Sequence, residues 1–118
     1  MSNKANIYNN LAIIEPASNT EQALQYVERA VELAPKSAAI LDTRGWLLTQ
    51  NGQLQEALNV LRLAFTLRCD DLTIRYHIAF TLNALGRFSE AKKELTLTLA
   101  SQRTFPEKQQ AEQLLATL

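Results

Sequence analysis

Cys69 and His77 are the only thiol and the only imidazole in this 118-residue chain, so nucleophilic catalysis would have to use them. A cysteine nucleophile needs a histidine within hydrogen-bond reach. Cys69 is expected in a turn and His77 about two turns into the next helix, which separates their backbones by about 10 Å or more. The spacing therefore predicts a small turn residue at Cys69 and a residue that packs or lines a groove at His77.

The other reactive residues do not predict an active site either. A zinc site needs three or four ligands, more than one Cys and one His supply. The sequence contains neither G-x-x-x-x-G-K-[ST] nor G-x-G-x-x-G, the loops that bind phosphate groups. Asp70 and Asp71 are adjacent acids, but we expect them to cap a helix that begins near Leu72. We therefore predict no enzymatic activity, no metal and no cofactor.

Trp46 and Phe80 are better suited to binding than to catalysis. Asp42 precedes Trp46 by four residues and Tyr76 precedes Phe80 by four, which is one turn of a helix. Rigid aromatic rings beside hydrogen-bonding groups are typical anchors for a protein partner. The pattern predicts an exposed aromatic strip edged by polar groups. The alternative is that Trp46 and Phe80 pack between helices.

The segments that must position these side chains are predicted to be helices. The chain has only three Gly and three Pro, and the stretches between them are rich in Ala, Leu, Glu, Gln and Arg, which are strong helix formers. No segment shows the alternating, β-branched pattern of a strand. The sequence therefore predicts an all-α fold.

The helices are predicted to come in pairs, because the sequence repeats with a period of 34 residues. Gly52 and Gly86 are expected to adopt positive φ and to turn the chain back between two antiparallel helices of about 12–14 residues. Apolar and small residues recur at helical spacing around them, which predicts a closely packed stripe on each second helix. The columns at this period are Ala23, Ala57 and Ala91; Val27, Leu61 and Leu95; Ala30 and Ala64; Leu33 and Leu67; Leu54 and Phe88; and Glu56 and Glu90.

The two ends of the chain depart from the period. Pro16 cannot lie inside a helix, so the first helix is expected to end at about Ile14. Residues 104–118 do not begin another repeat. Pro106 suits the first turn of a helix, and the residues that follow form one apolar stripe, as a capping helix requires. The members of the stripe are Ala111, Leu114, Leu115 and Leu118.

These columns resemble the tetratricopeptide repeat (TPR) family, whose pattern is W-x2-L-G-x2-Y followed by A-x3-F, A and P. In the second repeat, Gly45, Ala57 and Leu61 occupy matching positions. The resemblance implies an all-α TPR solenoid with a right-handed superhelix, built from three antiparallel helix hairpins and a C-terminal capping helix. One domain is expected over 1–118, with repeats at about 4–36, 37–70 and 71–103 and the capping helix at about 106–117.

The resemblance also implies a binding groove, because the first helix of each repeat lines the concave face. The carboxylate clamp of Hsp70/Hsp90 co-chaperones needs basic residues there. The matching positions here lack that basic pair, so we expect a different specificity. The partner-binding positions implied are Asn9, Ile13, Asp42, Trp46, Gln50, Tyr76, Phe80 and Asn83.

The segments LDTRGW and IRYHIA resemble, more closely, the C-terminal end of large TPR lipoproteins of PEP-CTERM/exosortase systems. That resemblance implies a role in bacterial protein sorting, export or exopolysaccharide assembly. It would make the chain a C-terminal fragment or a small stand-alone paralogue, cytoplasmic or, as a fragment, periplasmic.

Charge and composition indicate which partner the groove takes. Twelve basic and twelve acidic residues give a formal net charge of zero, whereas nucleic-acid binding requires a concentrated basic face. No apolar stretch approaches the roughly 18–20 residues that span a bilayer. The expected partner is therefore another protein or peptide, with no nucleic acid and no membrane span. The alternatives are a structural cap of a longer TPR array and a homo-oligomer formed through the N-terminal hairpin.

Overall fold

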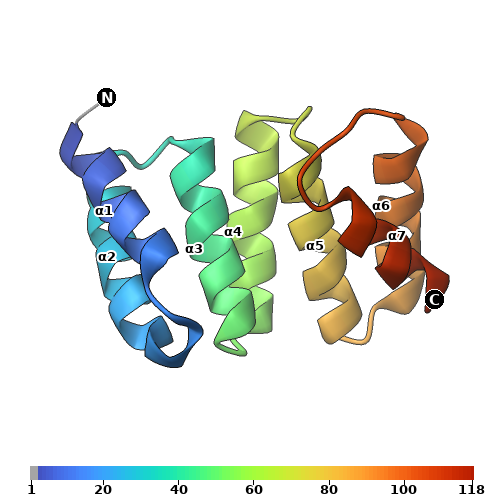
Figure 1. The fold of residues 1–118 in the computed structure, drawn as a ribbon, viewed down its shortest axis with the longest axis horizontal. Coiled ribbons are helices and arrows are strands. Elements are labelled where there is room, and N and C mark those ends of the chain that lie inside the picture. The colour runs from blue at the N-terminus through green and yellow to red at the C-terminus, as the bar shows by residue number, and fades with distance from the viewer. Residues whose placement is uncertain (1–2) are drawn as a thin grey trace.

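The computed structural model describes residues 3–118, which form seven α-helices and one short 3-10 helix with no strand (Figure 1). This confirms the predicted all-α fold. Met1 and Ser2, which we assigned to the domain, lie outside the described residues. The elements are α1 (Asn3–Ile14), η1 (Ala17–Asn19), α2 (Thr20–Leu33), α3 (Ala38–Gln50), α4 (Leu54–Leu67), α5 (Leu72–Ala84), α6 (Phe88–Ala100) and α7 (Lys108–Ala116).

The first six helices form three antiparallel pairs that stand side by side (Figure 1). The breaks between them are where the sequence predicts. Gly52 and Gly86 have φ of 83° and 80°, a conformation that glycine adopts without strain. Helix α1 ends at Ile14, just before Pro16. Asp71 caps α5, since its Oδ1 accepts a hydrogen bond from the backbone N–H of Ile74 at 3.1 Å.

Small residues allow the paired helices to approach closely. A Cβ added to Gly45 on α3 would lie 2.5 Å from Cγ of Leu61 on α4, so a larger residue does not fit without movement. Ala79 on α5, 34 residues after Gly45, is fully buried in the same cluster as Leu95 of α6. The predicted columns at Ala57, Ala64 and Ala91 are also fully buried.

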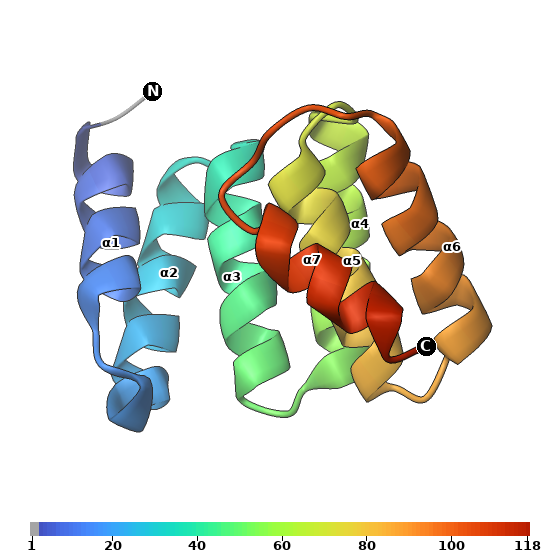
Figure 2. The same cartoon turned by 45° about the vertical axis from the view of Figure 1, so that its right-hand side comes forward.

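Helix α7 covers the last hairpin. It packs across α5 and α6, as Figure 2 shows. Ala111 of α7 and Phe105 of the preceding loop are buried against Leu72 and Tyr76 of α5, with Leu114, Leu115 and Leu118 partly buried around them. The C-terminal segment is therefore a packed helix, as its apolar stripe predicts, and its first residues reach the concave side of the molecule.

The tight contact between α3 and α4 predicts that Ala57→Leu destabilises the protein. Ala57 is fully buried, and its backbone oxygen faces Gly45, so three extra carbons overpack the contact by about 1–3 kcal/mol. The melting temperature should fall by several degrees in a thermal unfolding curve. Ala39→Leu, at an exposed position of α3, is the matched control and should change stability by less than about 0.5 kcal/mol. Equal melting curves for both variants would contradict this packing.

Candidate binding groove

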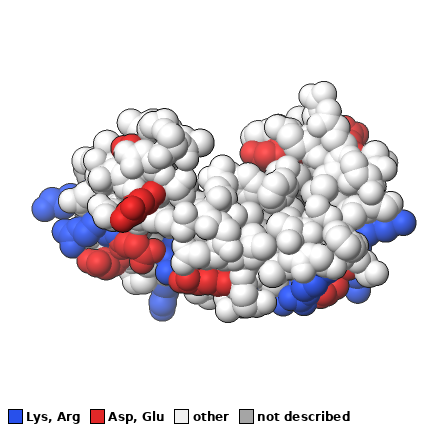
Figure 3. All heavy atoms as spheres, turned by 90° about the horizontal axis from the view of Figure 1, so that it is seen from below, with Lys and Arg blue, Asp and Glu red and all other residues white. Residues whose placement is uncertain are grey.

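A pocket of about 460 Å³ lies on the concave side, between the turn after α1 and the helices α3 and α5. Figure 3 shows it as the hollow between the two lobes of the molecule. Helix α3 forms its floor, because successive turns of α3 present their side chains there. The floor residues are Asp42, Thr43, Trp46, Leu47 and Gln50.

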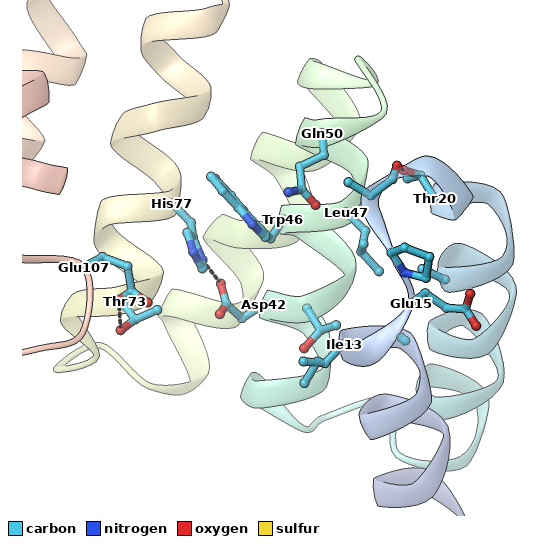
Figure 4. A pocket seen from close by; sticks show the side chains of 15 residues that line it. Ile13, Glu15, Thr20, Asp42, Trp46, Leu47, Gln50, Thr73, His77 and Glu107 are labelled. Carbon is cyan, nitrogen blue, oxygen red and sulfur yellow. Dashed lines mark hydrogen bonds and ion pairs between the residues drawn. The ribbon is translucent and has the colours of Figure 1, made fainter.

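Two walls enclose this floor, and Figure 4 shows both. One wall comes from α1, the turn that Pro16 imposes and the start of α2, with Ile13, Glu15 and Thr20. The other comes from α5 and the residue before α7, with Thr73, His77 and Glu107. Segments far apart in the sequence therefore build one site.

The structure places the eight predicted groove residues in different surroundings. Ile13, Asp42, Trp46 and Gln50 line the pocket. Phe80 lies beside it, 36% exposed, with its ring edge-on to Trp46 at 5.0 Å between centroids. The structure thus brings these five together, and Tyr76 adjoins them without lining the pocket, since its ring lies 6.4 Å from that of Trp46 and 6.3 Å from that of Phe80 between centroids.

Tyr76, Asn83 and Asn9 lie outside the pocket lining. Tyr76 is 6% exposed and is buried in the cluster beneath α7. Burial raises the pKa of its hydroxyl, and the negative charge of Glu107 raises it further. Asn83 lines a separate hollow near the C-terminus, beside Leu118. Asn9 is partly buried, and among the described residues its Oδ1 has no hydrogen-bond partner.

Trp46 packs beside three aromatic rings from α5, of which Tyr76 is the most distant at 6.4 Å between ring centroids. His77 stacks on the indole with ring centroids 4.2 Å apart and planes 20° apart. Phe80 meets it in the T-shaped contact described above, a geometry that aromatic pairs favour. His77 covers one face of the indole, and the part of the half-buried ring that His77 and Phe80 do not cover lines the pocket (Figure 4).

A polar contact between α3 and α5 fixes the orientation of His77. The Nδ1–H of His77 donates to Oδ1 of Asp42 at 2.7 Å, and the two side chains are only 10% and 17% exposed. Deeper between the same helices, the hydroxyls of Thr49 and Thr81 share a hydrogen bond of 2.7 Å. His77 therefore both packs and lines the groove, which covers the two roles the sequence predicts for it.

The arginines on the two groove helices α3 and α5 are engaged in ion pairs with other helices. Arg44 forms ion pairs with Glu28 of α2 and Glu56 of α4. Arg75 pairs with Glu94 of α6 at 2.8 Å. These three ion pairs connect neighbouring helices, and neither arginine lines the pocket, so neither guanidinium is placed to hold a carboxylate in the groove.

Sequence reasoning did not include Glu107 in the groove. The Oγ1–H of Thr73 donates to Oε1 of Glu107 at 2.6 Å, which fixes this carboxylate at the wall of the pocket. Glu107 precedes the capping helix and lies outside the 34-residue period, so no column of the repeat contains it. The connection between α6 and α7 was the one indication that Glu107 could line the groove, because this connection must return to the concave side for α7 to cover α5.

Neither a metal site nor a helix able to span a membrane is found among the described residues. Within residues 3–118, no three His, Cys, Asp or Glu side chains gather closely enough to hold a metal ion. No helix in this part of the chain is long and apolar enough to cross a membrane. Cys69 is an exposed free thiol in the turn before α5.

The fold and the groove define a helical-repeat protein of the solenoid class, whose stacked helix pairs present a concave surface. A family model for the tetratricopeptide repeat matches residues 48–118, which is more than half of the chain. The chain therefore belongs to the tetratricopeptide repeat family. Comparison with curated protein sequences finds no match.

Solved structures of low sequence identity share this fold. A double mutant of MamA from Desulfovibrio magneticus RS-1 is 22% identical with a TM-score of 0.81, covering 98% of this chain and 64% of that one. The type III secretion translocator chaperone SycD of Yersinia enterocolitica, described as an alternative dimer, is 17% identical with a TM-score of 0.84, covering 99% and 89%. The Arabidopsis OM64 TPR domain is 15% identical with a TM-score of 0.80, covering 97% and 95%. This chain thus spans less than two thirds of MamA.

The contact between Asp42 and His77 predicts energetic coupling between α3 and α5. In a double-mutant cycle, Asp42→Ala and His77→Ala should show a coupling energy of about 0.5–3 kcal/mol, because each variant removes the same buried hydrogen bond. Urea unfolding of the four proteins measures it. A cycle that pairs Asp42→Ala with Thr96→Ala, at an exposed position of α6, should be additive. Additivity in both cycles would contradict the contact.

Proposed function

We propose that this chain is a protein-interaction module that binds a segment of a partner protein in its concave groove, and that it acts without catalysis. The observation that carries the proposal is the setting of Trp46, a large aromatic residue in the floor of a pocket of about 460 Å³. His77 and Phe80 hold the indole in one orientation. A rigid aromatic residue of this kind loses little conformational entropy when a partner binds, which favours a binding hot spot.

The chemistry around Trp46 supports a peptide-like occupant. Ile13 and Leu47 offer apolar contacts, whereas Gln50 and Thr43 offer hydrogen bonds to a polypeptide backbone. The pocket is a depression between three helices, so an extended segment can pass across it. Membership of the tetratricopeptide repeat family supports the same conclusion, since repeat solenoids use their concave surface to bind partners.

The proposal also names the bacterial pathway in which this interaction module acts. The resemblance of LDTRGW and IRYHIA to exosortase-associated lipoproteins supports a role in bacterial protein sorting, export or exopolysaccharide assembly. Genes for an exosortase or for polysaccharide export beside the gene for this chain would support that role. A neighbourhood without either would count against it.

The first helix favours an alternative in which the chain stacks on another repeat or on a second copy of itself. Ile7 and Ile14 of α1 are 56% and 73% exposed. A repeat array normally covers such an outer face with a polar capping element. In that case the chain would serve as a structural cap or a homo-oligomer without a ligand of its own.

Selection from a phage-displayed random peptide library tests the groove. An enriched peptide should bind the wild-type protein. Trp46→Ala should raise the dissociation constant of that peptide by roughly 30-fold or more, because a central aromatic hot spot contributes about 2 kcal/mol or more. Phe88→Ala is the matched control, since Phe88 is an exposed aromatic residue that does not line the groove. Fluorescence anisotropy with a labelled peptide provides the constants.

Two outcomes would contradict the proposal. One is an enriched peptide whose binding depends on Phe88 and not on Trp46. The other is no enriched peptide, together with a dimer in sedimentation that Ile14→Ser dissociates; this result would favour the alternative.

A further inference from the structure

The groove carries a charge asymmetry that the whole chain does not. Twelve basic and twelve acidic residues balance over the sequence. Among the described residues that line the pocket, three are carboxylates and none is Lys or Arg. In Figure 3 the blue Lys and Arg atoms lie along the outer and lower edges of the molecule, away from the hollow. The field inside the groove is therefore negative, and it attracts positive charge.

All three carboxylates accept a hydrogen bond within the protein. Oδ1 of Asp42 accepts from His77, and Oε1 of Glu107 accepts from Thr73. Each of these bonds engages one oxygen, so the second oxygen of each group remains able to accept from a ligand. The third carboxylate, Glu15, accepts from Nδ2 of Asn19, and in Figure 4 it points away from Asp42.

Trp46 adds an aromatic surface one helical turn from Asp42, and His77 lies between this ring and Glu107 (Figure 4). Cations are attracted to the face of an indole ring, and this attraction is strongest for tryptophan. The planar guanidinium of arginine stacks on such a face and donates in parallel to carboxylates, whereas the ammonium of lysine is a compact, strongly hydrated charge. The combination of a fixed indole with two fixed carboxylates therefore suits arginine better than lysine.

We propose that the partner segment presents an arginine side chain to the pocket, where the guanidinium packs on Trp46 and donates to Asp42, while Glu107 adds negative charge at the α5 wall of the groove. Apolar residues beside that arginine contact Ile13 and Leu47. This inference rests on the proposed function, because it names the chemistry of the segment that the groove binds. It also gives the capping segment a second role, since Glu107 contributes to specificity as well as to the end of the solenoid.

A positional-scanning peptide array tests the inference. Each sublibrary fixes arginine, lysine, citrulline or glutamate at its centre and randomises the neighbouring positions among uncharged residues. Citrulline has the shape of arginine without the charge. The arginine sublibrary should bind the wild-type protein about tenfold more tightly than the citrulline sublibrary, the loss expected when charge-assisted hydrogen bonds are removed.

Variants of the carboxylates show whether the preference arises in the groove. Asp42→Asn should bring the arginine-to-citrulline ratio close to one, and Glu107→Gln should lower it, while the amide oxygen of each variant can still accept from His77 or Thr73. Glu112→Gln, at an exposed position of α7, is the control and should keep the ratio. Circular dichroism melts confirm that each variant folds.

The outcomes separate the inference from the function on which it rests. If the citrulline or glutamate sublibrary binds as tightly as the arginine sublibrary, and binding is lost in Trp46→Ala, the preference for arginine is overturned and the groove function stands. An arginine preference that persists in both carboxylate variants also overturns the inference. If no sublibrary binds in a manner that depends on Trp46, both proposals fail.

Discussion

The close contact between the two helices of each hairpin is the constraint on which the rest of this structure depends. Gly45 has no room for a Cβ against Leu61. Ala79 is fully buried in one cluster with Leu95, and Ala12 is buried with Val27. Because these small residues make the contact, the residue that follows each of them is rotated by about 100° on its helix, toward the concave side. Those following residues are Ile13, Trp46 and Phe80.

The side chains that line the groove are therefore determined in part by the close packing within each hairpin. Large side chains that would overpack the hairpins are instead displayed on the concave face. Polar contacts between neighbouring first helices, Asp42 with His77 and Thr49 with Thr81, then hold this face in one arrangement. The capping segment completes it with Glu107. Arg44 and Arg75 form ion pairs that connect neighbouring helices, and neither of them lines the groove.

Most of the fold could be predicted from the sequence, because a period of 34 residues with small and apolar columns requires stacked hairpins. Positive φ at Gly52 and Gly86, the end of α1 before Pro16 and the helical cap all followed from local chemistry. The site was predicted less completely. Asp42 and His77 are 35 residues apart, one more than the period, so their contact depends on how neighbouring helices are rotated. Glu107 lies outside the repeats.

Tyr76 illustrates the same limit. Its position within the third repeat matches a groove position, but the capping helix covers α5 there and buries its ring. Tyr76 is buried and Phe80 is exposed because α7, which the repeat pattern does not contain, packs over Tyr76. Local periodicity thus predicts which face of a helix a residue occupies, and tertiary packing determines whether that face stays open.

Fluorescence of Trp46 provides the most direct test of the central claim, that the floor of this groove is an open binding surface. Trp46 is the only tryptophan in the chain, so its emission reports on the groove alone. Acrylamide should quench the free protein readily, and a saturating groove-binding peptide should reduce the quenching and shift the emission to the blue. A blue-shifted, poorly quenched emission in the free protein, or quenching that stays unchanged while the peptide is bound, would contradict the account.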